Sequence, residues 1–472
     1  MLFKSANKKD GKVVVIGKSG GYRPVFSIIV LAWPIVIEMS LHTFMWVFDT
    51  AMVMRLGAHE ASAVEYGALV LFNTLLVMGT LGIGANALVA RFVGAGDRSN
   101  AAHTGGQAIS ISLLITIAYI TICLLFADSF FAWVIDDQLT MLLTQEYFFY
   151  ALVSGGFALF PLMVSNGVLR GTGNTRVPMF IAFIANTYNA VGDYVLIFGH
   201  FGFPELGVRG AALATGSAQL IALSLSLGYL FVYKSSLPFS IKALYPLDLS
   251  VYKKILKFSI PAGAEELTIS GTRMLSTSWL TTLGPVAFAA NAATIAAESL
   301  SFMPGHALAM ASTTLVGQRL GAGFPDQSRL TGYWAVFLGT LLMSSVGLIF
   351  ILFPYAIMAI FDPPDPEVMR LSVRCLQIAG LAQPATAMAM IFSGALKGTG
   401  DTKGPFRINL FISLFLRTPL MYLVIFVFPL EVYYIWWVVL IQYSTSAFFL
   451  MLRYRRKKWD QLEALPTTEN VG

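Results

Sequence analysis

Charged side chains are scarce in this sequence, since Asp, Glu, Lys and Arg make up only 12% of its 472 residues. A soluble domain carries about 25% charged residues, so the shortage argues against a soluble globular protein. Long apolar stretches recur instead from about Pro24 to Leu452, and about 20 apolar residues are enough to cross the hydrocarbon layer of a bilayer. Lipid offers the backbone no hydrogen-bond partner, so continuous runs of this length predict helices rather than a barrel.

The sequence also lacks the signatures of several other protein classes. Its two cysteines, Cys123 and Cys375, both fall inside apolar stretches, which excludes a disulfide framework. Its five histidines form no metal-ligand pattern. Gly17–Ser19 resembles the end of a phosphate-binding loop, but Lys12 stands where that loop needs its first glycine. Residues 1–24 are polar and basic, without the apolar core of a cleaved signal peptide. We expect no cofactor and, despite a net charge of +6, no nucleic-acid partner.

The apolar stretches predict an all-α integral membrane protein with twelve transmembrane helices. The expected spans are 25–54, 66–93, 104–126, 142–169, 177–199, 207–233, 252–279, 287–318, 331–353, 367–396, 404–428 and 432–452. An even number of spans puts both termini on the same side of the membrane. Most of the 31 lysines and arginines fall on that side, whereas the opposite loops are acidic around Asp136 and Asp362. The positive-inside rule therefore predicts a multi-pass protein of the cell membrane with both termini in the cytoplasm.

An internal repeat divides the chain into two halves. The segment GVLRGTGNTRVP, from Gly167 to Pro178, matches GALKGTGDTKGP, from Gly394 to Pro405, at an offset of 227 positions. Each repeat holds six expected helices, and an even number makes the repeats parallel, related by an axis along the membrane normal. We expect two six-helix lobes around a central cleft, which is the layout of an alternating-access transporter. The expected parts are a cytoplasmic N-terminal segment at 1–24, an N-lobe at 25–233, a cytoplasmic linker at 234–251, a C-lobe at 252–452 and a cytoplasmic tail at 453–472.

Carboxyl groups inside the expected spans are candidates for function, because a charge in lipid costs at least about 2.5–3.5 kcal/mol. Asp49 lies on the first expected span, and Asn189 and Asp193 lie four residues apart on the fifth. If these helices are neighbours, the two carboxylates share one site, and the pair can bind and release a proton or Na⁺. A static hydrogen-bonded pair that holds the lobe together would use the same residues.

Other polar residues in the spans are candidates for a substrate cavity. They are Glu38 and His42 on the first span, Glu265, Glu266 and Arg273 on the seventh, and Glu298 on the eighth. Glu266 and Arg273 are seven residues apart on one helix face, a spacing that allows an ion pair and would leave Glu265 as the freer acid. Prolines inside the spans remove a helical hydrogen bond and permit bending. The candidate hinges are Pro34, Pro161, Pro261, Pro304 and Pro384.

The chain resembles the multidrug and toxic compound extrusion (MATE) family over about residues 25–452. The motifs are WPIVIEMSLHTFMWVFDTAMVMRLG, LVARFVGAGD, LRGTGNTRVP, NAVGDYVLIFG and GVRGAALATG. The resemblance implies two six-helix lobes with a V-shaped cleft that export cationic or amphipathic compounds in exchange for H⁺ or Na⁺. It also implies an N-lobe cation site of the DinF-like branch at Asp49, Asn189 and Asp193, with Thr215 as a weaker match. The tenth expected span lacks the acid of NorM-type C-lobe sites.

We therefore expect a cation-coupled antiporter that exports small amphipathic, cationic compounds, works as a monomer among membrane lipids and is not an enzyme. A flippase for lipid-linked precursors, from the same superfamily, would favour a cavity lined with several arginines, and only Arg273 and Arg417 lie in spans. A membrane-embedded enzyme would need a catalytic set of side chains. The pair of Asp49 and Asp193 is the only arrangement in the sequence that resembles such a set.

Overall fold

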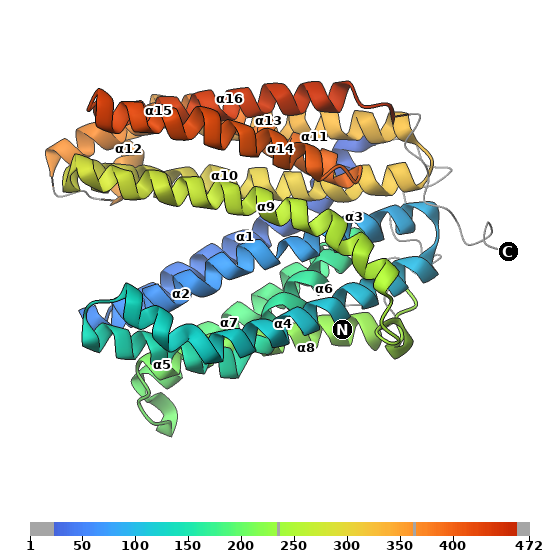
Figure 1. Cartoon of the computed structure of the whole chain (residues 1–472), viewed down its shortest axis with the longest axis horizontal. Coiled ribbons are helices and arrows are strands. Elements are labelled where there is room, and N and C mark those ends of the chain that lie inside the picture. The colour runs from blue at the N-terminus through green and yellow to red at the C-terminus, as the bar shows by residue number, and fades with distance from the viewer. Residues whose placement is uncertain (1–22, 234–236, 362–364, 460–472) are drawn as a thin grey trace.

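A computed structural model describes residues 23–233, 237–361 and 365–459, and the regular structure of these residues is entirely helical. The expected cytoplasmic segments fall partly outside this range: nearly all of residues 1–24, the first residues of the linker and the last 13 residues of the tail. Figure 1 shows two groups of long helices that lie close together at one end of the molecule and diverge toward the other end.

The first group of helices, which we call the N-lobe, runs from α1 to α8. Its helices are α1 (Pro24–Val53), α2 (Ala58–Met78), α3 (Thr80–Ala95), α4 (Arg98–Val134), α5 (Gln138–Gly155), α6 (Leu159–Gly171), α7 (Arg176–Phe198) and α8 (Val208–Phe231). Short 3₁₀ turns, η1 (Gly156–Ala158) and η2 (His200–Gly202), lie within this group. The six expected N-lobe spans correspond to α1, α2 with α3, α4, α5 with α6, α7 and α8.

The second group, which we call the C-lobe, begins after the 3₁₀ turn η3 (Ile241–Ala243). Its elements are α9 (Leu249–Leu280), η4 (Thr281–Leu283), α10 (Pro285–Gly321), α11 (Pro325–Leu352), α12 (Pro354–Met358), η5 (Ala359–Phe361), α13 (Pro366–Gly398), α14 (Lys403–Ile412), the π-helical η6 (Ser413–Arg417), α15 (Thr418–Tyr422), the π-helical η7 (Leu423–Val427) and α16 (Tyr433–Arg455). The eleventh expected span is the continuous segment from α14 to η7.

Eleven helical segments of the described chain are long and apolar enough to cross a membrane. The one expected span outside these eleven is the seventh, which is α9 with 32 residues, a length of about 48 Å at 1.5 Å per residue. Its composition is less apolar because it has Lys253 and Lys254 near its start and carries Glu265, Glu266 and Arg273 further along. The expectation of an all-α, twelve-helix membrane fold is confirmed. Several helices, such as α4 and α10 with 37 residues each, extend well beyond the expected apolar cores because helical structure continues into the polar ends.

Helix α1 belongs to both packing groups. Its first half packs against α10 and α11, and its second half packs against α7. One hydrophobic cluster joins Ile28 and Ile35 of α1 to Leu450 and Tyr454 of α16. The start of α1 and the end of α16 therefore lie at the same end of the molecule, as an even number of spans requires.

The two lobes touch where α3 crosses α10, close to this same end. A Cβ atom added to Gly94 would collide with the carbonyl oxygen of Gln318, and one added to Gly321 would collide with the carbonyl oxygen of Arg91. These two contacts are related by the 227-residue offset of the repeat. The Thr314 hydroxyl also donates a hydrogen bond to Asn86 Oδ1 across the crossing, at 3.0 Å. The repeat therefore produces a two-fold-like crossing in which only glycine allows the backbones to approach this closely.

The predicted hinge prolines differ in their surroundings. Pro34, Pro261, Pro304 and Pro384 lie inside continuous helices. Pro161 instead lies in the first turn of α6, directly after the 3₁₀ segment that breaks the fourth span. A further irregularity, at Gly79 in the second span, has no proline. The π-helical turns of the eleventh span flank Pro419, which the prediction did not include among the hinges.

Candidate functional site

The N-lobe places two carboxyl groups against each other. Because α1 packs along α7, the side chains of Asp49 and Asp193 lie within hydrogen-bonding range of one another. The Asn189 side chain, one turn before Asp193, donates a hydrogen bond from Nδ2 to Asp193 Oδ2 at 2.9 Å. Asp193 is 1% exposed and Asn189 is 6% exposed, so the structure brings together all three residues that the sequence suggests for a cation site.

The two carboxyl groups lack some of the hydrogen-bond donors that would stabilise their negative charges. No N–H or O–H group of the described residues donates a hydrogen bond to Asp49 Oδ1 or Asp193 Oδ1, although both atoms are buried. Two carboxylates at this separation repel each other strongly unless a proton or a cation lies between them. The arrangement can therefore exchange between a charged form and a neutralised form, which is what a coupling-ion site requires.

Tyr147 of α5 is a member of this site that the sequence analysis missed. It is 4% exposed, its hydroxyl is hydrogen-bonded to Thr215 of α8, and it lies within electrostatic range of Asp49 and Asp193. Its ring packs directly against Gly67 of α2. No motif or spacing on α5 indicates this role, because the contact depends on how α5, α7 and α8 pack together. The structure thus joins Thr215 to the carboxyl pair through Tyr147.

Two buried ion pairs lie deeper toward the end where the lobes touch. Glu38 of α1 accepts a hydrogen bond from Arg170 of α6 at 2.6 Å, and Glu265 of α9 lies 3.0 Å from Lys397 Nζ of α13. Both members of the second pair follow those of the first by the offset of the repeat. Both carboxylates are almost fully buried, so each needs its basic partner. The pairs connect the fourth span of each repeat to the first.

Glu265 is therefore not the freer acid of α9, contrary to the prediction. Besides Lys397, it accepts hydrogen bonds from Ser393 at 3.0 Å and from Asn409 at 2.7 Å. The ion pair between Glu266 and Arg273, which would have left Glu265 free, is not formed among the described residues, although the two side chains lie within electrostatic range. The sequence interpretation failed because it considered neighbours along α9 alone, whereas the partners of Glu265 come from α13 and α14.

The remaining candidates for a substrate cavity lie on α1, α9 and α10. His42 lies within electrostatic range of Glu38 and Arg170, and Glu298 lies within range of Arg273 and Arg417. The Arg273 guanidinium is 5.9 Å from the centre of the Phe302 ring, close enough for a cation–π contact. The described residues contain no group of three or more His, Cys, Asp and Glu side chains that could hold a metal ion. A Na⁺ at the carboxyl pair would need the amide oxygen of Asn189 or further oxygens to complete its ligands.

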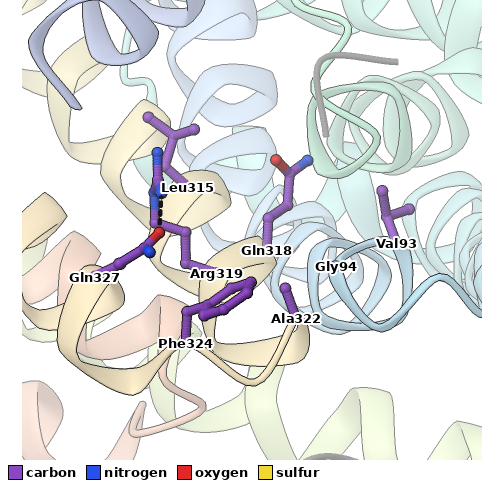
Figure 2. Close-up of a pocket in the computed structure, with 8 residues that line it drawn as sticks. All are labelled: Val93, Gly94, Leu315, Gln318, Arg319, Ala322, Phe324 and Gln327. Atoms are coloured by element: carbon purple, nitrogen blue, oxygen red, sulfur yellow. Dashed lines mark hydrogen bonds between the residues drawn. The ribbon is translucent and has the colours of Figure 1, made fainter. Parts of the chain in front are cut away.

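A small pocket lies at the crossing of α3 and α10 (Figure 2). Its lining residues are Val93, Gly94, Leu315, Gln318, Arg319, Ala322, Phe324 and Gln327. Arg319 Nη1 donates a hydrogen bond to Gln327 Oε1 at 2.9 Å across one side of it. The cavity has about 30 Å³ of free volume, which is room for about one water molecule. It is therefore too small to hold an organic substrate.

Comparisons with known proteins agree with this fold. The MatE family model matches residues 34–195 and 261–423. A probable multidrug resistance protein NorM from Thermotoga maritima is 29% identical over 445 residues, which cover 94% of this chain and 95% of the relative. The multidrug resistance protein MdtK from Yersinia pestis is 28% identical over 391 residues, covering 81% of this chain and 84% of the relative. Among solved structures, a MOP superfamily transporter from Pyrococcus furiosus has a TM-score of 0.86 at 22% identity, over 93% of this chain and 97% of that one.

The family match covers corresponding parts of both repeats, and it covers more than half of the chain. It does not distinguish the predicted DinF-like branch from the others. The chain belongs to the MATE family of membrane transporters and is not an enzyme.

Proposed function

We propose that this transporter exports small amphipathic compounds, many of them cationic, in exchange for H⁺ or Na⁺ that binds at Asp49, Asn189 and Asp193. The observation that carries the proposal is the buried carboxyl pair of Asp49 and Asp193, each of which has one buried oxygen that accepts no hydrogen bond from the described residues. The names of the relatives, multidrug resistance proteins NorM and MdtK, support drug-like substrates.

Ion binding and substrate transport are coupled because the ion and the cationic substrate compete for the negative charge of the carboxyl pair. When a proton or Na⁺ neutralises the carboxyl pair, the attraction for a cationic substrate weakens and the substrate is released outward. When the ion leaves toward the cytoplasm, the charged pair attracts a new substrate. Linkage then requires that ion and substrate weaken each other's binding by the same factor. The membrane potential contributes about 2.3 kcal/mol for each elementary charge that crosses 100 mV.

Helix α1 can transmit this change between the lobes. Asp49 lies near the end of α1 that packs against α7, while the other end packs against α10 and α11 of the C-lobe. Pro34 lies inside the helix, within the part that packs against the C-lobe. Neutralising Asp49 removes the repulsion that its helix end experiences, so α1 can bend at Pro34 and change its contacts with both lobes. We assign secondary hinge roles to Pro161, Pro261, Pro304 and Pro384.

The proposal also covers the location, orientation and oligomeric state of the transporter. We place the protein in the cell membrane as a monomer, with both termini and the crossing of α3 and α10 on the cytoplasmic side. Residues 25–233 and 252–452 would then rock against each other around the crossing. The substrate would enter between the lobes, where Glu38, His42, Glu266 and Glu298 are candidate contacts.

Transport by purified protein in liposomes tests this function. A fluorescent cation is trapped, and proton and sodium gradients are imposed separately. We expect one gradient to drive transport by the wild type and neither to drive transport by Asp193→Asn. The matched control is Asp136→Asn, which removes an exposed acid outside the helices. Wild-type rates in a well-folded Asp193→Asn protein would remove the carboxyl pair from the mechanism.

A further inference from the structure

The C-lobe carries a group of basic side chains at the end of the molecule where the lobes touch. Helix α9 contributes Lys253, Lys254 and Lys257, and the start of α14 contributes Lys403 and Arg407. All five side chains are exposed. Helices α9 and α14 pack against each other, so the five residues form one group, which we call the basic patch.

Two contacts between α9 and α14 place the two parts of the basic patch side by side. A Cβ atom added to Gly400, in the turn before α14, would come within 2.8 Å of the Phe258 ring of α9. Further along both helices, Asn409 donates a hydrogen bond to Glu265 at 2.7 Å. The helices therefore run in the same direction from the same end. At 3.6 residues per turn, the lysines that precede Phe258 and follow Gly400 then lie on the same side of the helix pair.

The acids at this end of the C-lobe already have basic partners of their own. Asp401, in the turn before α14, lies 2.7 Å from Arg453 Nε and 3.5 Å from Lys457 Nζ. Asp248 caps the start of α9 and lies 3.3 Å from His103 of α4. Neither acid is left over to neutralise the basic patch.

The two acids further along α9 do not neutralise the basic patch either. Glu265 lies 3.0 Å from Lys397 Nζ, and the basic groups within electrostatic range of Glu266 are Lys397 and Arg273. Within residues 23–233, 237–361 and 365–459, no carboxylate forms an ion pair with any of the five patch residues. The patch therefore keeps a net positive charge.

The internal repeat indicates that the fold does not require this charge. The N-lobe helices that correspond to α9 and α14 are α1 and α7, which also pack against each other. At the offset of 227 positions, four of the five patch residues have uncharged counterparts: Phe26, Ser27, Val30 and Phe180. Only Lys403 has a basic counterpart, Arg176. Both lobes cross the membrane in the same orientation, so the positive-inside bias alone does not explain why the C-lobe has five basic residues here.

Apolar surface adjoins the basic patch on both helices. Ile260 lies seven residues after Lys253 on α9, and Phe411 lies four residues after Arg407 on α14; each is 63% exposed. Both apolar residues lie further into their spans than the basic residues, where exposed side chains contact acyl chains. A free anion would use only the charge of this surface, whereas a phospholipid would use both its charge and its apolar part.

We propose that the basic patch binds the headgroup of an anionic phospholipid from the leaflet at this end of the molecule, with its acyl chains along Ile260 and Phe411. Basic side chains at the ends of membrane helices attract anionic headgroups, and the guanidinium group of Arg407 can donate two parallel hydrogen bonds to a phosphate. The site lies on the outer surface of α9 and α14, apart from the carboxyl pair of the N-lobe, and does not depend on the coupling ion.

A matched pair of lipids tests the proposal. Phosphatidylglycerol and phosphatidylcholine with the same acyl chains are titrated separately into the purified full-length protein in a nonionic detergent, and native mass spectrometry measures the affinity for the first bound lipid. We expect the wild type to bind phosphatidylglycerol about tenfold more tightly than phosphatidylcholine. Lys257→Gln and Arg407→Gln should each weaken binding of phosphatidylglycerol about fivefold, and the double variant should bind both lipids equally.

Further variants separate this site from a general attraction to positive charge. Arg176→Gln removes the N-lobe counterpart of Lys403 and is the matched control, which should leave binding of both lipids unchanged. Arg407→Lys keeps the charge and should retain most of the affinity.

Three results would contradict the lipid site. They are equal affinities of the wild type for both lipids, a loss in Arg176→Gln as large as that in Lys257→Gln, and displacement of phosphatidylglycerol by an equal concentration of inorganic phosphate. The last result would assign the basic patch to a free anion instead. None of these results involves the carboxyl pair, so each would leave the proposed export function intact.

Discussion

Replacement of Gly321 by alanine tests the crossing of α3 and α10 as a gate. A Cβ at this position would overlap the carbonyl oxygen of Arg91, and the helices would have to separate by more than about 1 Å to restore ordinary contact. A carbonyl group inside a helix cannot rotate away as the end of a side chain can. Overpacking of this kind costs about 1–3 kcal/mol. Because about 1.4 kcal/mol is a factor of ten in an equilibrium constant, the conformation closed at this crossing should lose at least several-fold in population.

Thiol labelling measures this shift. The Thr314 hydroxyl lies in the crossing, bonded to Asn86, so Thr314→Cys reports its opening in a background that lacks Cys123 and Cys375. In inside-out membrane vesicles, a membrane-impermeant thiol reagent should label this cysteine about tenfold faster when Gly321→Ala is present. The control is Gly271→Ala, a helical glycine whose added Cβ would meet no atom within 4 Å. Equal labelling rates for Gly321→Ala and Gly271→Ala would refute the interpretation of the crossing as a gate.

Three further changes have defined expectations. Glu38→Gln leaves Arg170 without its carboxylate and should cost about 3–5 kcal/mol, whereas Glu38→Gln with Arg170→Gln should recover most of the thermal stability of the purified protein. Asp248→Ala removes the cap of α9 and should cost about 1 kcal/mol. Hydrogen bonds, first from Ser250, lower the pKa of Asp248 to about 2, so this cap should stabilise fully above about pH 4 and fade as pH falls toward 2, which thermal unfolding at several pH values will show. Tyr147→Phe should slow ion-coupled transport about tenfold with little loss of stability, and an unchanged rate would exclude the hydroxyl from the cation site.

The helices and the repeat were predictable because their signals are local. Apolar length determines a span, and the matching GTGNT and GTGDT segments end up in matching turns, where Gly173 and Gly400 have φ values of 86° and 84°. In these turns Asn174 and Asp401 each accept a hydrogen bond from a backbone N–H three residues later. Identical local chemistry at a fixed offset therefore produces the same backbone twice.

The sequence could predict the association of Asp49 with Asp193 only on the assumption that α1 and α7 are neighbours. The sequence alone does not show which helices are neighbours. Partners that come from several helices were not predictable. Tyr147 joins the carboxyl pair through the packing of α5 against α8, and Glu265 binds Lys397 on a helix more than 100 residues later. The π-helical turns around Arg417 did have a sequence signal that the analysis missed, because Pro419 lies between them and removes a helical hydrogen bond.

The central claim is that ion and substrate compete through the carboxyl pair of Asp49 and Asp193. The most direct measurement is the affinity of the purified protein for a fluorescent cation between pH 5.5 and 8.5, with and without sodium. We expect the affinity of the wild type to fall at low pH or with added sodium, and the double variant Asp49→Asn/Asp193→Asn to lose this dependence. A wild-type affinity that stays constant in both titrations would contradict the account.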